Sequence, residues 1–467
     1  MRRVKIVATI GPATSSEEAL SGIIKSGVDV IRINGAHGDV SAIGQRIQGV
    51  RDLSKKLGES TGILVDLPGP KMRVGVIENE ELPLEEGDEL KIVNKDVIGN
   101  KDGISTTVAD LYSIVNPGDP IILADGQIRS EVVKVKGKEI FLKVLSTGIL
   151  KSKKGFFLPN AEDKIEPYSD RDKEIIAESV KHGVDFLGLS FVRRGSDVDE
   201  IRAMLPEGSR THLIAKIETK SAVDELPSIL ASADAVMVAR GDLGIQLDIT
   251  RVPLLQKEII RACNQSGRPV ITATEMLESM TTQPLPTRAE VGDVANAVLD
   301  GTDAVMLSGE TAVGRYPSET VGTMAQVALQ AETWRKRRVP DVCVLGEDPV
   351  AWAVAHAVVQ AAEDLNVKTI LCPTRSGATA RRIATYRPSA SIVGISKNKH
   401  VLAQLSLVWG VEPLEMIDEI DESHEVEQII NLCIEKGLVN KGDLVAVAAG
   451  SPGHEAGGTD SIRIVRA

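Results

Sequence analysis

Short runs of β-branched and other apolar residues recur through the first two-thirds of the chain, and most are separated by segments whose apolar residues follow helical spacing. Eight runs are expected to be strands: VKIVAT (4–9), VDVIRI (28–33), GILVDL (62–67), DFLGLS (185–190), LIAKIE (213–218), AVMVAR (235–240), PVITAT (269–274) and DAVMLS (303–308). Segments 16–27, 171–183 and 253–267 are expected to be helices, and each ends on glycine. Eight strand–helix repeats predict an α/β fold, a (β/α)8 TIM barrel.

The rhythm breaks between the third and fourth strands, where roughly 120 residues replace a single helix. From 71 to 164 the sequence alternates glycine-punctuated strands with almost no helical periodicity, which predicts an inserted small β-barrel domain. After Arg338, helices and strands alternate anew, as in a doubly wound α/β domain, with helices expected over 401–410 and 426–437 and no strand between them. We therefore expect three domains: 1–70 with 165–338, 71–164, and 339–467.

Composition narrows the class of protein. The 467 residues are 42% hydrophobic and contain no apolar run of the roughly 18 residues that a membrane span requires. The net charge of −12 argues against a nucleic-acid surface, and the basic cluster 335–338 is interpreted as a solvated helix end. The N-terminus reads as a strand, not a secretory leader, and scattered cysteines fit a reduced interior. We expect a cytoplasmic protein with no membrane or nucleic-acid partner.

All eight expected strands end in polar residues. In a barrel of this kind chemistry lies at the C-terminal ends of the strands. Capping or structural ion pairs could explain any one of these residues, but a full ring of them favours a functional face. They are Thr9, Arg32, Asn34, Asp66, Ser190, Lys216, Glu218, Arg240, Asp242, Thr274, Glu275, Ser308 and Glu310.

Lys216 and Glu218 stand two residues apart on one expected strand, so both side chains project to the same side. Asp242 supplies a second carboxylate, and two carboxylates with room for water and substrate oxygens suit Mg²⁺. With Arg32 nearby, these charges are typical of phosphoryl transfer. Gly241 and the helix expected after it offer backbone N–H groups to an anion. Thr274 could add a hydroxyl, or could equally be a strand residue facing the core.

These segments resemble the pyruvate kinase family along the whole chain. The resemblance rests on TIGPAT, IRINGAHG, DLPGPKMRVG, LSFVR, IAKIET, MVARGDLG, ITATEMLESM, the long segment 286–317, and the C-terminal α/β pattern. It implies an enzyme that transfers the phosphoryl group of phosphoenolpyruvate to ADP, giving ATP and pyruvate, as the last step of glycolysis. The resemblance also implies a requirement for Mg²⁺ or Mn²⁺ and a homotetramer.

The resemblance also implies roles for individual residues. Arg32 would hold the substrate phosphate, and Lys216 would stabilise the transferring phosphoryl group and the enolate. The remaining roles are Mg²⁺ binding by Glu218 and Asp242, substrate-carboxylate binding by Gly241, Asp242 and Thr274, and nucleotide binding by Asn34, His37 and Arg73. The inserted domain would be a lid. The donor that protonates the enolate stays open among Thr274, Ser308 and water.

The chain departs from the family where many members bind K⁺. Those members use an Asn, a Ser two residues later, an Asp–Thr pair, and a Glu five positions after that Asp. Here Asn34 and Asp66 remain, but Ala36, Leu67 and Lys71 occupy the other three positions. Members with Lys in place of that Glu are expected to work without K⁺, so we predict that K⁺ is not required.

In the C-terminal domain, a polar loop between a strand and a helix resembles the family's effector loop, which can hold phosphate at a helix N-terminus. Its residues are Thr374, Arg375, Ser376, Gly377 and Thr379. Segment 450–460 has no Lys or Arg, which disfavours fructose 1,6-bisphosphate as effector. The sequence of this loop is equally compatible with a phosphorylated effector that carries one phosphate and with no effector.

Two other functions fit part of this pattern. Another Mg²⁺-dependent, enolate-forming barrel enzyme would explain Lys216, Glu218 and Asp242, but not the insert or the C-terminal domain. A catalytically silent homologue that senses a metabolite through 374–379 would explain the loop. The intact Arg32 and Lys216 speak against the silent homologue.

Overall fold

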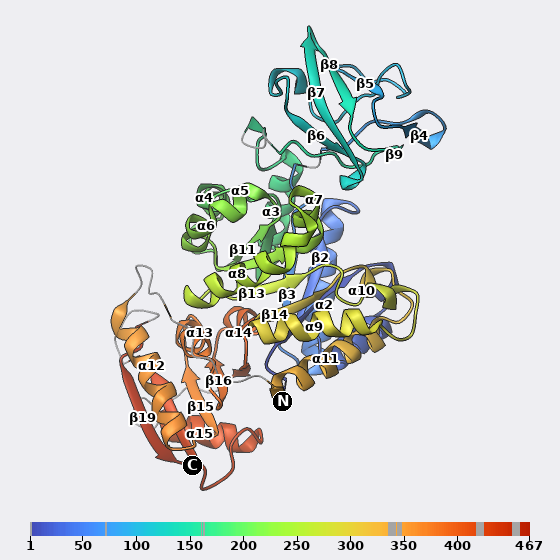
Figure 1. Ribbon diagram of the computed structural model, residues 1–467. Coiled ribbons are helices and arrows are strands. Elements are labelled where there is room, and N and C mark those ends of the chain that lie inside the picture. The colour runs from blue at the N-terminus through green and yellow to red at the C-terminus, as the bar shows by residue number, and fades with distance from the viewer. Residues whose placement is uncertain are drawn as a thin grey trace.

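The computed structural model describes residues 2–70, 72–159, 161, 164–334, 342, 348–416, 425–450 and 458–467. The described residues form three parts. Figure 1 shows a central part of strands and helices, an all-β part above it, and an α/β part below it at the C-terminal end of the chain.

Eight parallel strands of the central part close into a barrel. In barrel order they are β1 (Lys5–Ile10), β2 (Val30–Asn34), β3 (Gly62–Asp66), β10 (Phe186–Leu189), β11 (His212–Ile217), β12 (Ala235–Ala239), β13 (Val270–Ala273) and β14 (Ala304–Leu307). Strand β3 pairs with β10 across the insert, and β1 pairs with β14 to close the ring. The predicted (β/α)8 fold is confirmed, and each strand lies within two residues of its expected run.

Helices cover the outside of the barrel. They are α1 (Glu17–Lys25), α2 (Val40–Leu57), α3 (Asp170–Lys181), α4 (Gly195–Met204), α5 (Lys220–Asp224), α6 (Leu226–Ser232), α7 (Arg240–Gln246), α8 (Val252–Gln265), α9 (Arg288–Asp300), α10 (Gly309–Ala312) and α11 (Pro317–Trp334). The three helices expected from periodicity are α1, α3 and α8. The sequence placed a helix after the ARGDLG motif, which is wrong: α7 begins at Arg240, so every residue of the motif except Ala239 lies inside the helix.

The barrel has two layers of apolar packing. A large cluster fills the space between strands and helices, and a smaller one fills the interior of the ring, where Val7, Phe186 and Met306 are buried. Leu407, from the C-terminal part, belongs to this interior cluster and is 1% exposed. The C-terminal part therefore contributes to the packing of the barrel interior.

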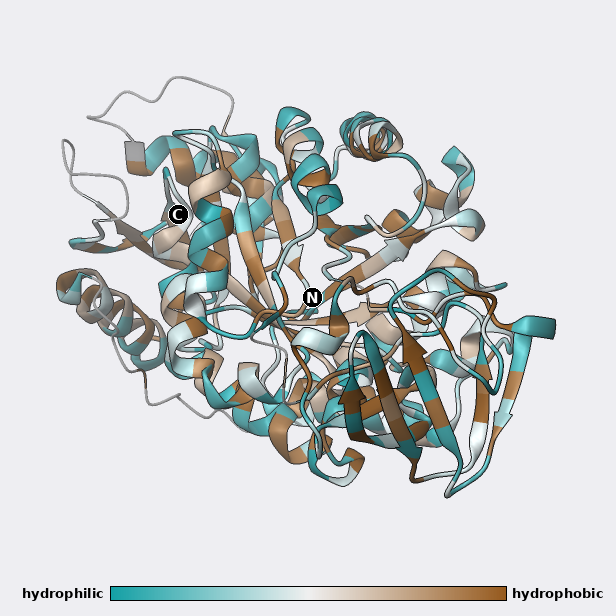
Figure 2. Cartoon of the chain, turned by 90° about the horizontal axis from the view of Figure 1, so that it is seen from above, coloured by the Kyte–Doolittle hydropathy of each residue, from teal (hydrophilic) through white to brown (hydrophobic). Residues whose placement is uncertain are grey.

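The insert consists of antiparallel strands with a hydrophobic core of its own. Strand β4 (Glu81–Leu84) pairs with β9 (Gly148–Lys151). The second sheet has the order β5 (Glu89–Val93), β8 (Glu139–Val144), β7 (Ile128–Lys136) and β6 (Pro120–Leu123). Hydrophobic and hydrophilic blocks alternate along strands of this part in Figure 2, as expected for sheets with one buried face.

The C-terminal part is a five-stranded sheet with the order β17 (Val411–Glu415), β16 (Ser391–Ser396), β15 (Thr369–Pro373), β18 (Leu444–Ala449) and β19 (Ser461–Arg466). Only β19 is antiparallel to its neighbour. Its helices are α12 (Pro349–Asp364), α13 (Ala378–Thr385), α14 (Lys399–Leu405) and α15 (Glu425–Glu435). The sequence predicted a helix over 401–410 and no strand after it. Instead α14 ends at Leu405, and β17 is an edge strand, the position in a sheet that tolerates Pro413.

The cysteines and the lengths of the helices bear on the smaller sequence predictions. Cys263, Cys372 and Cys433 are buried free thiols, whereas Cys343 and the basic cluster 335–338 lie outside the described residues. Within the described part of the chain, every helix is too short or too polar to cross a membrane. The expected cytoplasmic location stays a prediction.

Candidate active site

Arg32 and Asp66 form a partly buried ion pair at the C-terminal ends of β2 and β3. Arg32 Nε donates to Asp66 Oδ2 at 2.9 Å, and Arg32 Nη2 donates to the same oxygen. Arg32 Nη1 donates to Thr9 Oγ1, also at 2.9 Å. A guanidinium has five N–H groups, so two of them are left for an anion.

Lys216, on β11, lies beside this pair. Its ammonium nitrogen is 2.7 Å from Ser190 Oγ, 2.8 Å from Glu218 Oε1 and 3.3 Å from Asp66 Oδ1. Ser190 Oγ in turn donates to the Leu67 carbonyl at 2.6 Å, which ties β10 to β3. Three oxygen atoms therefore surround the ammonium, and the Asp66 oxygen is the most distant and is paired by charge without a hydrogen bond. An incoming phosphoryl oxygen would compete with this longest contact.

The charges in this cluster shift one another's pKa. Burial alone would raise the pKa of Asp66, but Lys216 and Arg32 outweigh it and hold that pKa below its usual value. Burial alone would lower the pKa of Lys216, but Asp66 and Glu218 outweigh it and raise that pKa. At neutral pH the site therefore holds two fixed cations, Arg32 and Lys216, and a fixed anion, Asp66.

Glu218 and Asp242 are the two carboxylates predicted to bind metal. Glu218 is 1% exposed and accepts the Phe191 N–H at 2.7 Å through Oε2. Burial, reinforced by Asp242, raises the Glu218 pKa, although Lys216 opposes the shift. Asp242 lies in the first turn of α7 and accepts no hydrogen bond from the described residues. The described residues hold no cluster of three or more metal-ligating side chains, so any metal here would rely on these two carboxylates.

Thr274 lies just beyond β13 and does not face the core as an ordinary strand residue. Its φ of 69° is left-handed, as is that of Glu275 at 52°, a conformation that costs non-glycine residues free energy. The Thr274 hydroxyl donates to the Ala273 carbonyl at 2.6 Å and accepts the Gly241 N–H at 2.8 Å. The Gly241 N–H that was expected to be free for an anion is therefore occupied by Thr274.

The residues predicted to bind nucleotide are less closely gathered. Asn34 Oδ1 accepts the Ala36 N–H at 3.0 Å in a local turn, and His37 is exposed on the same loop. Arg73 is exposed at the base of the insert, where Nη1 donates to the Lys153 carbonyl at 3.1 Å. Among the described residues, no hydrogen bond or ion pair joins Arg73 to the Asn34 loop. Lys71 lies outside the described residues.

The C-terminal loop is compact and capped from within. The Gly377 N–H donates to Thr374 Oγ1 at 2.9 Å, and Gly377 has φ 77° at the start of α13. Thr379 Oγ1 lies 2.6 Å from Thr459 Oγ1. Ser376 Oγ is buried and has no hydrogen-bond partner among the described residues. Segment 451–457 lies outside the described residues.

Sequence reasoning missed some supporting residues of the site and overrated Glu310. Ser190 was noted as a polar strand end but not as the partner of Lys216, and Arg240 contacts the Thr274 backbone. Arg171 donates to the Gly38 carbonyl at 2.7 Å and so contacts the loop that carries His37. Glu310 accepts backbone N–H groups of Ser308 and Leu277 at 2.7 and 3.1 Å, which is a structural role. The presence of Ser190 and Arg240 at strand ends was the available signal.

Comparison with known proteins identifies the family. Residues 1–321 match the family model described as pyruvate kinase, barrel domain, and residues 352–465 match the model described as pyruvate kinase, alpha/beta domain. The chain belongs to the pyruvate kinase family. It is accordingly a phosphotransferase of the kinase class.

Relatives of known name agree with this assignment to the pyruvate kinases. A pyruvate kinase of Bacillus licheniformis is 42% identical over 474 residues, covering 99% of this chain and 80% of that protein. One from Geobacillus stearothermophilus is 42% identical over 471 residues with the same coverage. A crystal structure of a pyruvate kinase from Cryptosporidium parvum superposes with a TM-score of 0.90 at 34% identity, covering 100% of this chain and 96% of that one.

Proposed function

We propose that this pyruvate kinase transfers the phosphoryl group of phosphoenolpyruvate to ADP, giving ATP and pyruvate. The observation that carries the proposal is the Lys216 ammonium, held by Ser190, Glu218 and Asp66 beside Arg32. The buried Lys216 ammonium and the partly buried Arg32 guanidinium at one point match the negative charge that spreads over the oxygens of a transferring phosphoryl group. Arg32 would bind the substrate phosphate with its two unused N–H groups.

Mg²⁺ or Mn²⁺ fits the donor set of Glu218 and Asp242. Both are oxygen ligands, and two carboxylates completed by water and phosphate oxygens are a usual Mg²⁺ environment. Asp242 has no hydrogen-bond partner among the described residues. Its negative charge helps to raise the Glu218 pKa, and a cation bound between the two carboxylates would lower that pKa again. A divalent ion bound there would supply neutralisation of the substrate oxygens.

The remaining groups have roles in binding and proton transfer. Gly241, Asp242 and Thr274 lie together at the end of β12 and β13 and would bind the carboxylate end of the substrate, once Thr274 releases the Gly241 N–H. Loss of the phosphoryl group leaves an enolate, whose carbon must gain a proton. Thr274, Ser308 and water are the candidate donors. Asn34, His37 and Arg73 would contact the nucleotide when the insert closes as a lid.

The direct test is pyruvate formation from phosphoenolpyruvate and ADP with Mg²⁺. We expect Lys216→Ala to lose activity by at least about a thousandfold, because it removes charge stabilisation from the transferring group. Lys220→Ala is the matched control, since Lys220 is an exposed lysine four residues later that pairs with Asp224. Absence of ADP-dependent pyruvate would favour the silent sensor. Phosphoenolpyruvate turnover without ADP would favour another enolate-forming enzyme.

We also infer that the reaction needs no K⁺. Asp66 Oδ1 accepts no hydrogen bond from the described residues, although it lies 3.3 Å from Lys216 Nζ. A further cation near Asp66 would satisfy this oxygen, and the sequence offers Lys71 five residues later in place of a carboxylate. The fixed charge of Lys71 would substitute for a bound monovalent ion.

Potassium dependence can be measured in Mg²⁺ buffer with a tetramethylammonium salt to keep the ionic strength constant. We expect added KCl to change kcat by less than about twofold in the parent enzyme. Lys71→Glu should make the enzyme depend on KCl, because the variant regains a carboxylate and loses the fixed cation. Strong KCl activation of the parent enzyme would refute the inference.

The proposal extends to organisation and regulation. We infer the domains 1–70 with 165–338, 71–164 and 339–467, supported by a main hydrophobic cluster in each of the three parts. Loop 374–379 would bind a phosphorylated effector, supported by the unpartnered Ser376 hydroxyl and the start of α13 beside it. A homotetramer is the expected assembly. Sedimentation of the enzyme with and without inorganic phosphate or a sugar monophosphate would test effector binding and assembly together.

A further inference from the structure

The turn after β13 has an unusual backbone. Thr274 and Glu275 are consecutive non-glycine residues with φ of 69° and 52°. Left-handed backbone is unfavourable for residues with a Cβ atom and persists only where the surrounding structure enforces it. Something outside the turn must therefore hold it.

The guanidinium of Arg240, the first residue of α7, contacts this turn. Its Nη2 donates to the Thr274 carbonyl at 2.6 Å and to the Glu275 carbonyl at 3.3 Å. Its Nε donates to the Ala273 carbonyl at 3.2 Å. One planar group thus contacts three successive carbonyls, a geometry that a single ammonium cannot reproduce.

Arg240 is itself held from two other helices. Its Nη1 lies 2.7 Å from Asp293 Oδ2 on α9 and donates to Gln256 Oε1 on α8 at 3.2 Å. The Arg240 side chain is 10% exposed. These contacts fix the guanidinium on the side away from the turn, so the side chain is a rigid support.

The turn and the support meet again at the Thr274 hydroxyl. Thr274 Oγ1 accepts the N–H of Gly241, the residue that follows Arg240, at 2.8 Å. Arg240 therefore fixes Thr274 from its carbonyl side, while the next residue in the chain contacts its hydroxyl. A shift of the Arg240 guanidinium would therefore displace both the carbonyl and the hydroxyl of Thr274.

We propose that Arg240 is a positioning residue whose guanidinium, supported by Asp293, holds Thr274 in the left-handed turn that places its hydroxyl beside Gly241. The proposal rests on the function proposed above for Thr274. Its consequence is that Arg240 acts on catalysis through Thr274 alone and makes no contact with substrate.

The test is a double-mutant cycle on kcat, using Arg240→Lys, Thr274→Ala and the double variant in the full-length enzyme. Arg240→Lys keeps the charge beside Asp293 but loses the three-carbonyl contact. We expect it to lower kcat by about 30-fold and to change KM for phosphoenolpyruvate by less than about threefold, because Arg32 and Lys216 are untouched. In the Thr274→Ala background the same change should cost less than about threefold.

Two further variants control for general damage. Arg202→Lys makes the same substitution at an arginine that donates to the Ser232 carbonyl and pairs with Asp234 away from the site, and it should leave kcat unchanged. Asp293→Asn should lower kcat in the same direction as Arg240→Lys but less, since it weakens only the support of Arg240. It covers the case in which Arg240→Lys fails to fold.

The possible results separate this proposal from the function on which it rests. Loss of activity in Arg240→Lys that multiplies with that of Thr274→Ala would overturn the positioning role, while leaving pyruvate formation by the parent enzyme intact. Full activity in Thr274→Ala would overturn both the positioning role and the role of Thr274. A parent enzyme that forms no pyruvate would overturn the proposed function itself. Non-multiplicative loss with unchanged KM supports the proposal.

Discussion

At the scale of single residues, Ser190 supports Lys216 without carrying charge. Its hydroxyl contacts the ammonium at 2.7 Å and donates to the Leu67 carbonyl at 2.6 Å. We expect Ser190→Ala to lower kcat by about tenfold with KM for phosphoenolpyruvate nearly unchanged. Asp66 and Glu218 would still hold the Lys216 ammonium, but its orientation would be less well fixed. Steady-state kinetics measure this. Ser179→Ala, at a buried serine hydroxyl without a described partner, should have no effect on kcat.

The residues of the candidate active site show how much of the site the sequence predicts. Arg32, Asp66, Lys216 and Glu218 could be placed together because parallel strands end on one face of a barrel and each residue ends a recognisable strand. The contacts of Arg240 with the Thr274 carbonyl depend on a left-handed turn and on the direction of a long side chain. Neither follows from strand order or residue spacing, so the contact between Arg240 and the Thr274 turn could be found only in the structure.

At the scale of elements, β11 carries titratable groups at both ends: Lys216 near the active site and the half-buried His212 at the opposite end. Burial, reinforced by Arg381 and Arg202 and opposed by Asp234, lowers the His212 pKa to about 4. The ordinary value is 6.5, so between these values the unfolded chain binds a proton that the folded chain does not. This contribution to stability is present above pH 6.5 and is lost as the pH falls towards 4.

His212→Gln should therefore flatten the acid side of the stability profile. We expect the thermal midpoint of the parent enzyme to fall further between about pH 7 and about pH 5 than that of the variant. Differential scanning calorimetry at the two pH values gives both changes. Equal falls in the two proteins would show that His212 titrates normally in the folded state.

The elements also differ in how well periodicity predicts them. The barrel strands are buried on both sides and read as continuous apolar runs, so they were placed within two residues. Strand β17, with sequence VEPLE, has neither alternation nor an apolar run. Its pairing with β16, from Ile392 with Val411 to Ser396 with Glu415, forms a strand that local sequence does not predict.

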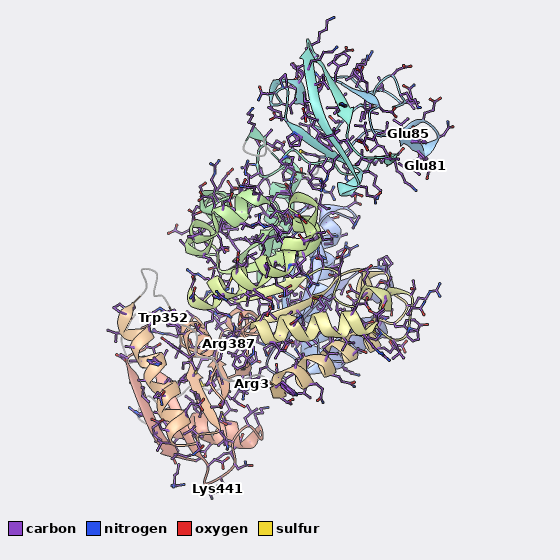
Figure 3. The ribbon with its side chains drawn as sticks, in the orientation of Figure 1. Arg3, Glu81, Glu85, Trp352, Arg387 and Lys441 are labelled. Atoms are coloured by element: carbon purple, nitrogen blue, oxygen red, sulfur yellow. The ribbon has the colours of Figure 1, made fainter. Side chains whose placement is uncertain are left out.

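At the scale of the whole molecule, a buried cluster joins the barrel to the C-terminal part. Figure 3 shows Arg3 and Arg387 where the two parts meet. Arg387 Nη1 donates to Asp303 Oδ1 at 2.8 Å, and the two side chains are 4% and 6% exposed. The guanidinium carbons of Arg387 and Arg3 lie 4.9 and 5.2 Å from the ring of Trp409. The two parts are thus joined by charge and stacking as well as by apolar packing.

Arg387→Met should loosen this junction. The variant leaves Asp303 buried without its cation, a loss that typically costs about 3–5 kcal/mol. We expect a lower thermal midpoint, and a smaller drop for Arg387→Met combined with Asp303→Asn than the sum of the single changes. An unchanged midpoint in Arg387→Met would mean that the junction does not contribute to stability.

The order in which the strands close has a consequence for biosynthesis. Strand β3 cannot pair with β10 until the insert has been synthesised, and β1 cannot pair with β14 until Ala304–Leu307 has been synthesised. The nascent chain therefore leaves the ribosome with an incomplete sheet whose edges are open to other chains. The insert has its own core and can complete its sheets during this interval. Chaperone demand during translation should thus be greatest before β14 emerges.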